Sequence, residues 1–179
     1  MRPGIIFPLF KTLLFTLLLP GASAVYAPAW LLYNRPDPFA LNPGWLRFLG
    51  LLPLIAGVLI YLRCAWDFSV TGRGTPLPAD PPKTVVHVGL YRFTRNPMYV
   101  GIITLQLGEA LLFQSWAVLR FAAGTFILVH LFILLYEEPN LRRRFGGTYR
   151  EYCAHVPRWL PRLHPYRPLA VPAGGSANE

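Results

Sequence analysis

Four apolar blocks, separated by short polar stretches, dominate the hydrophobic pattern of the chain. They cover residues 12–33, 45–62, 98–114 and 116–136. A transmembrane helix needs about 20 mostly apolar residues to cross the hydrocarbon core of a bilayer. The third block is the shortest, and Gln106 and Glu109 interrupt it. The pattern predicts an all-α integral membrane protein with about four transmembrane helices.

The polar residues at the block ends predict how the last two helices begin and connect. Proline suits the first turn of a helix and asparagine suits the N-cap position, so we expect the third helix to begin near Pro97, with Asn96 before it. Only Gln114-Ser115 separates the third and fourth blocks. Such a short turn predicts that these two helices pack as an antiparallel hairpin.

The chain after the fourth block contains an acidic pair, a proline and a glycine pair. We expect Pro139 to end the helix directly after Glu137 and Glu138, because proline interrupts helices. One or two helical turns should follow and end at Gly146-Gly147. A short amphipathic helix on the membrane surface should come next. Its apolar face is expected to carry Tyr149, Tyr152 and Val156.

The organisation indicates one membrane domain. We expect residues 1–70 to hold helices 1 and 2, residues 71–163 to hold helices 3 and 4 with the tail helix, and residues 164–179 to be disordered. The Gly- and Pro-rich stretch 71–82 is either a linker or a lid over a site. The N-terminus resembles a signal peptide, but apolar residues continue to Tyr33. We therefore expect it to be retained, with a kink at Pro20-Gly21.

The net charge of +9 could suggest a nucleic-acid partner, but its placement favours a membrane. With four spans, all but Arg35, Arg47 and Arg120 of the 17 basic residues fall on one side. The positive-inside rule then places both termini and the central loop in the cytoplasm. We expect contacts with anionic membrane lipids and none with nucleic acid. Arginine far outnumbers lysine, which is typical of GC-rich genomes and indicates a bacterial inner membrane.

The two cysteines, Cys64 and Cys153, stand in neither a disulfide nor a metal-ligand spacing. We expect two free thiols and no metal site.

Several polar residues lie at membrane depth, where an ionisable group is costly and suggests function. Tyr99, Gln106 and Glu109 fall within one side of a helix, and His130 lies seven residues before Glu137. They could form a polar wall of an internal cavity. Alternatively, Glu109 makes an interhelical hydrogen bond and His130 is a satisfied core histidine. The second interpretation is favoured for His130, and both remain open for Glu109.

The acidic pair Glu137-Glu138 also has two interpretations. Carboxylates at a helix C-terminus oppose the helix dipole, so their placement suggests a function, such as binding ribose hydroxyls or an ammonium group. The alternative is pairing with the arginines that follow, at positions 142–144.

A set of short motifs resembles the isoprenylcysteine carboxyl methyltransferase family, which belongs with the phospholipid methyltransferases. These are integral membrane enzymes that use S-adenosyl-L-methionine. The resemblance covers roughly residues 72–163. The motifs are Gly89-Leu90-Tyr91, Arg95-Asn96-Pro97-Met98-Tyr99-Val100-Gly101, Glu137-Glu138, Phe145-Gly146, Tyr149, Tyr152 and Val156-Pro157.

The resemblance implies a cofactor pocket formed by the cytoplasmic loop and the C-terminal tail, and a methyl acceptor that is a lipophilic small molecule or a lipid. A carboxylate or thiolate acceptor needs no general base, whereas an amine does. The candidate catalytic residues are Arg95, Glu109 and Glu138. The implied cofactor contacts are Lys83, Thr84, Val85, Val86, Tyr91, Asn96, Pro97, Met98, Tyr99 and Glu137.

Two positions depart from the pattern of that family. Asn96 stands where the eukaryotic enzymes have a histidine, and its amide cannot titrate. Ile133 stands where they have a substrate-binding arginine, which argues against a prenylcysteine carboxylate substrate. Two alternatives remain: an NADPH-dependent membrane enzyme similar to sterol reductases, and a membrane scaffold without enzymatic activity.

Overall fold

The computed structural model describes residues 18, 20–41, 43–71 and 88–167, with the backbone alone at 68–71. Within these residues all regular elements are helical, apart from one isolated β-bridge between Pro38 and Ser115. The elements are η1 (Ala22–Tyr26), α2 (Ala27–Asn34), η2 (Gly44–Gly50), α3 (Leu51–Thr71), η3 (Gly89–Arg92), α4 (Pro97–Leu112), α5 (Trp116–Phe132), η4 (Ile133–Glu137) and α6 (Glu138–His155).

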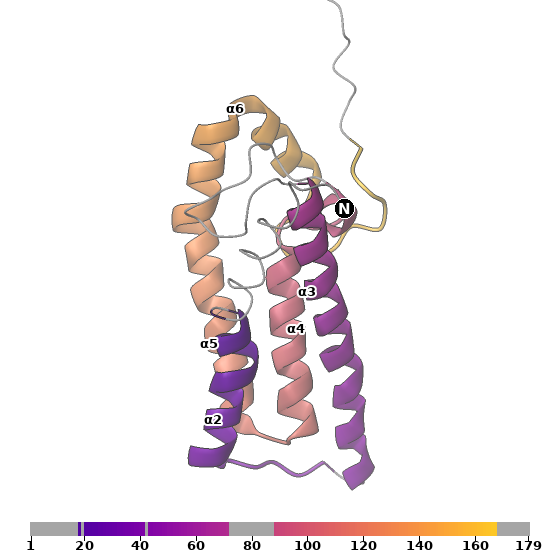
Figure 1. Cartoon of the computed structure of the whole chain (residues 1–179), viewed down its shortest axis with the longest axis vertical. Helices are drawn as coiled ribbons and strands as arrows, with labels where there is room; N and C mark the ends of the chain where they lie inside the picture. Colours follow the sequence, from indigo (N-terminus) through magenta and orange to yellow (C-terminus); the bar gives the residue numbers. More distant parts are fainter. Residues whose placement is uncertain (1–17, 19, 42, 72–87, 168–179) are drawn as a thin grey trace, which may run out of the picture.

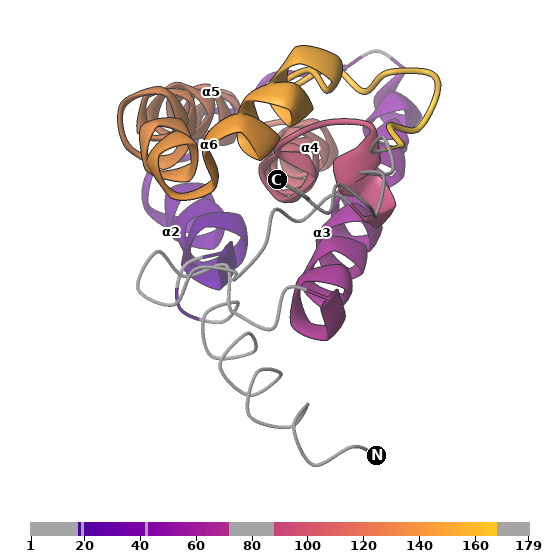
Figure 2. The same cartoon turned by 90° about the horizontal axis from the view of Figure 1, so that it is seen from above.

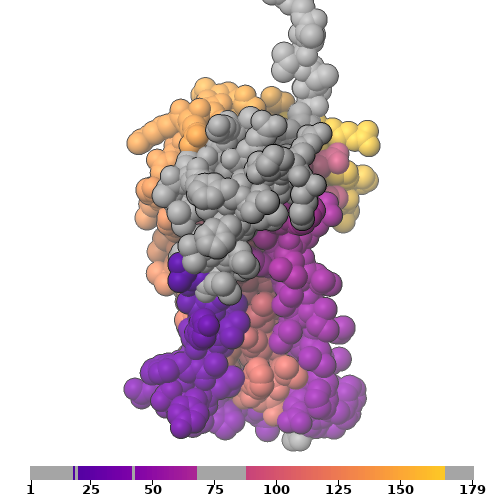
Figure 3. Space-filling model, in the orientation of Figure 1, coloured from indigo at the N-terminus to yellow at the C-terminus, as the bar shows by residue number. Residues whose placement is uncertain are grey.

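The long helices lie side by side, and α6 covers one end of the bundle (Figure 1). Seen from that end, α6 leaves the α5 corner and passes across the end of α4 (Figure 2). In the space-filling view, α2 and α3 flank the α4 region in the lower half of the molecule (Figure 3). The expectation of an all-helical protein is confirmed for the described residues.

Two helices in the described part of the chain are long and apolar enough to cross a membrane. They are Gly44–Asp67, formed by η2 and α3, and Trp116–His155, formed by α5, η4 and α6. Only 22% and 17% of their apolar windows are buried, so their apolar side chains mostly face outwards, unlike those of a soluble core helix. Helix α4 is apolar but shorter. The count of four spans therefore stays a prediction.

Helix α4 touches the continuous helix formed by η2 and α3 backbone to backbone at two glycine pairs. Gly50 faces Gly108, and Gly57 faces Gly101. A Cβ atom added to Gly57 would lie 2.5 Å from the Gly101 carbonyl oxygen and 2.5 Å from the Leu105 nitrogen. Glycine at such contacts lets apolar helices approach closely, which is how membrane helices gain van der Waals contact without a hydrophobic driving force.

The predicted turn between the third and fourth helices is confirmed. Helix α4 ends at Leu112 and α5 begins at Trp116, with Gln114 at a φ of 51°. The Ser115 hydroxyl caps α5 by accepting a hydrogen bond from Val118 N at 3.3 Å. The loop after α2 joins this turn, because Trp116 N donates to the Asp37 carbonyl oxygen at 2.9 Å.

Helix α3 extends beyond the apolar block 45–62 and ends at Thr71. One of the predicted helix ends is wrong. Pro139 does not end the fourth helix, because the π-helix η4 precedes it and the chain stays helical through α6. The Glu138 N–H there bonds to the Ile133 carbonyl oxygen, five residues back. The acidic pair is consequently inside a long helix, and the argument from the dipole of a helix C-terminus does not apply to it.

The other π-helix, η1, also comes just before a proline. It ends at Tyr26, two residues before Pro28, as η4 ends at Glu137, two residues before Pro139. A proline lacks the N–H that would bond to residue i−4, and its ring collides with that carbonyl group. A widened turn before the proline lets the helix continue. Pro20 and Gly21 are also helical, and η1 follows them.

The expected break in the tail helix occurs at Gly146, where φ is +53° and ψ is −122°. A positive φ is easily adopted by glycine, which has no Cβ atom. Beyond this kink, Tyr149, Tyr152 and Val156 are all buried and pack with Tyr166. The prediction that these three residues share one apolar face is therefore confirmed.

Candidate functional site

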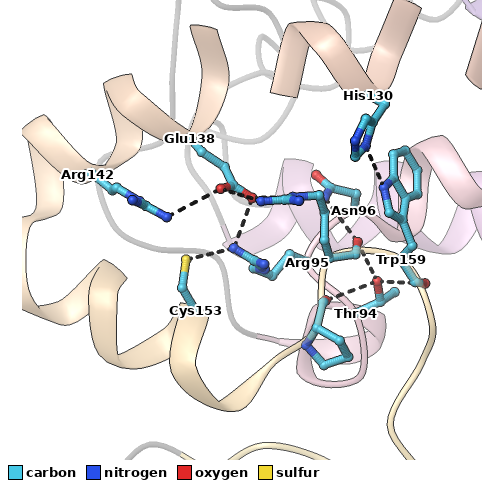
Figure 4. A network of polar contacts seen from close by, with 10 residues as sticks. Thr94, Arg95, Asn96, His130, Glu138, Arg142, Cys153 and Trp159 are labelled. Carbon is cyan, nitrogen blue, oxygen red and sulfur yellow. Dashed lines mark hydrogen bonds and ion pairs between the residues drawn. The ribbon is translucent and has the colours of Figure 1, made fainter. Parts of the chain in front are cut away.

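Residues 92–97, which contain the Asn-Pro step before α4 and which we call the corner, lie beside the acidic pair Glu137-Glu138. Figure 4 shows Arg95 and Asn96 of the corner next to Glu138. Arg95 Nη1 donates to Glu138 Oε1 at 2.9 Å. The Tyr99 hydroxyl donates to Glu137 Oε2 at 3.3 Å. The antiparallel packing of α4 and α5 brings these segments together, although some 40 residues separate them in the sequence. The two clusters therefore adjoin in the folded protein.

Glu138 is the centre of a buried network of arginines. Arg158 binds it with both ends of its guanidinium, at 2.8 Å from Nε to Oε1 and 3.0 Å from Nη2 to Oε2. Arg95 and Arg142 complete the set, the latter at 3.6 Å. The Glu138 side chain is only 5% exposed. This carboxylate therefore depends on its partners for compensation of its buried charge.

The arginines also set the ionisation of Glu138. Burial by itself would raise the pKa of this carboxyl group, but the hydrogen bonds from Arg158 and the charges of Arg95, Arg158 and Arg142 hold the pKa below its ordinary value. Glu138 is thus ionised and fully paired at neutral pH, so it is poorly suited to accept a proton from a substrate. The alternative interpretation of the acidic pair, ion pairing with arginines, applies to Glu138. Its main partners are Arg158 and Arg95 rather than residues 142–144.

The C-terminal tail is bound to the corner by side-chain hydrogen bonds. The Thr94 hydroxyl lies 3.0 Å from the Arg158 carbonyl oxygen, and Asn96 Nδ2 donates to the same oxygen at 3.1 Å. Asn96 occupies the N-cap position of α4 as predicted, but its side chain makes no capping hydrogen bond. The amide holds the tail instead.

Backbone hydrogen bonds extend this contact along the tail. Arg95 N donates to the Pro157 carbonyl oxygen at 2.9 Å, Arg162 N to that of Phe93 at 3.0 Å, and Tyr166 N to that of Arg92 at 2.9 Å. Before the tail, in α6, the Tyr152 hydroxyl donates to the Tyr91 carbonyl oxygen at 2.6 Å. Residues 156–166, which we call the tail segment, therefore run beside residues 91–96.

Several of the expected cofactor contacts are packed into the protein. Tyr91 and Met98 form a buried cluster with Tyr61 and Cys64 of α3, and Pro97 is also buried. Burial raises the pKa of the Tyr91 phenol well above its ordinary value, with smaller contributions from Cys64 and Glu137 among others. A cofactor contact of these three residues stays a prediction. The expected contacts Lys83, Thr84, Val85 and Val86 lie outside the described residues.

Glu137 differs from Glu138 in having unused hydrogen-bonding capacity. Among the described residues, its carboxylate accepts the hydrogen bond from Tyr99 and has no ion pair. Burial raises the pKa of Glu137 to about 7, and the ionised form of its carboxylate offers about four acceptor positions. It can therefore bind hydroxyl or ammonium groups of a ligand while Tyr99 holds it in place.

The polar residues predicted on one side of α4 have different environments. Gln106 is fully buried, and its Nε2 donates to the Ser23 carbonyl oxygen and hydroxyl at 3.0 and 2.9 Å, so it links α4 to the N-terminal helix. Glu109 lies ten residues beyond Tyr99, about 15 Å further along the axis. The structure does not bring Glu109 to Glu137 and Glu138. His130 Nδ1 accepts a hydrogen bond from Trp159 Nε1 at 3.0 Å, as expected for a satisfied histidine.

The sequence reasoning missed a buried acid at the end of α3. Asp67 is 7% exposed and pairs with Arg63 at 3.1 Å. A Cβ atom at Gly89 would lie 1.9 Å from Asp67 Oδ2, and Gly89 has a φ of +55°. Gly89 of the Gly89-Leu90-Tyr91 motif is thus needed for its positive φ and because the Asp67 carboxylate occupies the space of a side chain. Sequence reasoning also missed Thr94, Arg158 and Trp159, whose roles depend on contacts that no local pattern reveals.

The cysteines are free, as expected. Cys153 Sγ lies 3.0 Å from Arg95 Nη1, at the edge of the arginine network. In the described part of the chain, no three His, Cys, Asp or Glu side chains are grouped so that they could hold a metal ion.

Comparison with known proteins identifies methyltransferases among the relatives. Methanethiol S-methyltransferase 1 of Bradyrhizobium diazoefficiens is 33% identical over 93 residues, which are 52% of this chain and 31% of that protein. Methanethiol S-methyltransferase 2 of the same organism is 30% identical over 94 residues, 52% of this chain and 34% of that protein. The cobalt-zinc-cadmium resistance protein CzcN of Cupriavidus metallidurans is 29% identical over 135 residues, 75% of this chain and 57% of that protein.

The chain thus spans between about a third and just over half of the length of these relatives. No solved structure matches it. The family described as phospholipid methyltransferase matches residues 45–148, which are more than half of the chain and include the corner, the acidic pair and most of the helices that carry them. This match confirms the resemblance seen in the motifs, and the chain belongs to the phospholipid methyltransferase family.

Proposed function

We propose that the protein is an integral membrane methyltransferase that transfers a methyl group from S-adenosyl-L-methionine to a small lipophilic acceptor. The observation that carries the proposal is the meeting of the corner with the acidic pair, in which Glu138 is neutralised and Glu137 has no ion pair within the described part of the chain. Membership of a methyltransferase family supports the reaction type.

The described residues fit this cofactor. Its ribose hydroxyls and its ammonium group are hydrogen-bond donors, and Glu137 offers the acceptor oxygens they need. Bound there, S-adenosyl-L-methionine supplies a methyl group already activated on a sulfonium sulfur. The chain then has to bind and orient both reactants and keep water away. Tyr99 fixes the Glu137 carboxylate, and the tail segment holds the corner in place.

The described site favours an acceptor that reacts as an anion, and we propose a thiol that first loses its proton to water and then reacts as its thiolate. Glu138 is a poor base because its pKa is held low by three arginines. Glu109 is about 15 Å of helix away from Tyr99. Ile133, where related enzymes have a carboxylate-binding arginine, is fully buried. Two relatives are named as methyltransferases of methanethiol, a small thiol.

Calorimetric titration of the purified protein separates this proposal from its alternatives. We expect S-adenosylhomocysteine to bind and NADPH not to bind. Binding of NADPH alone would favour a reductase, and binding of neither would favour a scaffold.

Transfer of radiolabelled methyl groups to a panel of acceptors then tests the acceptor class. The panel should contain an alkanethiol, a fatty acid and an alkylamine of equal chain length. We expect labelling of the thiol above the other two. Preferential labelling of the amine would contradict an acceptor that needs no base.

A further inference from the structure

The end of the tail segment carries two leucines whose exposure is unusual for a well-anchored chain. Leu160 is 81% exposed and Leu163 is 92% exposed. The same stretch is fixed to the corner at Arg162 N and Tyr166 N by backbone hydrogen bonds to Phe93 and Arg92. The two leucines are therefore presented on a fixed loop rather than on a fraying end.

Trp159 shows the level at which this loop lies. Its indole donates to His130 (Figure 4). It also packs on Phe126, with ring centroids 4.9 Å apart. Both residues belong to α5, seven and eleven residues before Glu137. Measured along a helix, they are about 10 and 16 Å from the acidic pair.

The length of the apolar part of this helix places that level within the membrane. Residues 116–136 extend about 31 Å, close to the thickness of a hydrocarbon core. The face of α5 and η4 near His130 is exposed and apolar, with Leu131 at 45%, Leu128 at 70% and Leu135 at 76%. Because residues 116–136 match the hydrocarbon core, His130 lies about 9 Å inside its cytoplasmic end, and the Trp159 indole bound to it reaches the acyl chains of the cytoplasmic leaflet.

The charges around the loop favour lipid over a protein partner. Leu160 lies between Arg158 and Arg162 in the sequence and Leu163 lies between Arg162 and Arg167, and Arg167 is exposed. Apolar side chains between arginines suit the boundary between acyl chains and anionic headgroups.

We propose that residues 158–163 form a loop that inserts into the cytoplasmic leaflet beside α5, with Leu160 and Leu163 among the lipid acyl chains. The tail segment then does more than complete the site. It fixes the corner and the start of α6 to the bilayer surface at a defined depth. This proposal concerns the placement of the loop and holds whether or not the proposed methyl transfer is correct.

Spin labels at the two leucines test the depth of the loop. Leu160→Cys and Leu163→Cys are made separately, in a background with Cys64→Ala and Cys153→Ser that must remain monodisperse with an unchanged unfolding temperature. Thr148→Cys, at an exposed position of α6, is the control. Each variant is reconstituted into vesicles of phosphatidylcholine with phosphatidylglycerol. The collision rates of the nitroxide with oxygen, which concentrates in lipid, and with a water-soluble nickel chelate are then measured.

We expect labels at positions 160 and 163 to collide more with oxygen than with the nickel chelate, and the label at position 148 to show the reverse. Nickel collision rates at 160 and 163 equal to that at 148 would overturn the proposal, because the loop would then lie in water. Labels shielded from both reagents would also overturn it, because protein rather than lipid would then cover the leucines. Both positions are surface sites, so neither label requires repacking of the core.

Discussion

Two adjacent glutamates have contrasting environments in this protein. Glu138 is enclosed by three arginines, whereas Glu137 is held by one tyrosine and has no ion pair among the described residues. The difference arises because consecutive residues of a helix point about 100° apart. One side chain faces the tail segment and the other faces Tyr99. The same residue type can thus hold the fold together at one position and remain available for a ligand at the next.

Replacing Glu137 with glutamine should weaken cofactor binding. The variant Glu137→Gln loses a charge-assisted hydrogen bond, which is worth about 1.5–3 kcal/mol. We expect the dissociation constant for S-adenosylhomocysteine to rise by about 10- to 100-fold, with the same unfolding temperature within error. Calorimetric titration measures the affinity. The control is Glu151→Gln, which removes an exposed carboxylate from α6, and unchanged affinity of Glu137→Gln would remove Glu137 from the site.

Replacing Glu138 with glutamine should instead destabilise the fold. Removing one partner of a buried ion pair leaves the other charges uncompensated and costs about 3–5 kcal/mol. We expect Glu138→Gln to lower the unfolding temperature in detergent at pH 7, as measured by loss of the monodisperse gel-filtration peak on heating. An unfolding temperature equal to that of the parent would show that the arginines find other partners.

The stability of the parent should also depend on pH through Glu138. The folded-state pKa of this group lies below its ordinary value, so the unfolded chain binds its proton first as the pH falls. The stabilisation is present above the ordinary glutamate pKa and is lost as the pH falls through the folded-state value. We expect the parent to lose stability below about pH 4 and Glu138→Gln to lose less over the same range. Parallel pH profiles would contradict this assignment.

At the scale of elements, helix packing follows from where small residues and prolines stand. The paired glycines are seven residues apart on each side, at 50 and 57 in η2 and α3 and at 101 and 108 in α4, and they meet in antiparallel order. The π-helices η1 and η4 each end two residues before a proline. The glycine contacts bring two helices together, and the π-helix η4 keeps a long helix continuous through the acidic pair.

Filling a glycine contact should separate α3 from α4. Gly57→Val puts a side chain where backbone atoms of Gly101 and Leu105 lie 2.5 Å from the added Cβ. Overpacking of this kind costs about 1–3 kcal/mol or more, so we expect a lower unfolding temperature. The matched control is Gly124→Ala on α5, where a Cβ meets nothing within 4 Å and where alanine favours the helix by about 1 kcal/mol. Equal effects of the two changes would contradict the close packing.

At the scale of the whole molecule, the tail segment connects the two ends of the site. It binds the corner through Thr94, Arg95 and Asn96, and it binds the start of α6 through Arg158. The corner, the acidic pair and the tail segment should therefore open and close as one unit.

Loss of the Thr94 hydroxyl tests this coupling. Thr94→Val keeps the shape of the side chain but removes its hydrogen bond to the tail carbonyl groups, a loss of about 1–3 kcal/mol at a buried site. We expect faster amide hydrogen exchange in residues 91–96 and 157–166 together, measured by mass spectrometry, and no change in α3. Thr148→Val, at an exposed position, should leave both segments unchanged. Faster exchange in only one of the two segments would show that they are not coupled.

Much of the fold follows from local chemistry and could be predicted. The apolar blocks gave the helices, Pro97 gave the start of α4, and Gln114-Ser115 gave the hairpin turn. Gly146 gave the break in the tail helix, and the spacing of the tyrosines gave its buried face. The paired glycines were visible in the sequence too, but their meaning depended on knowing that α3 and α4 are neighbours.

The amino-acid sequence by itself thus determined the helices, the turn and the family, because apolar periodicity, capping and motif spacing act over a few residues at a time. Only the tertiary structure decided which polar groups are satisfied. It showed that Arg158 neutralises Glu138, that Asn96 holds the tail instead of capping α4, and that η4 carries the helix past Pro139. The pairing of a buried charge depends on side chains brought together from distant segments, and no local pattern specifies these partners.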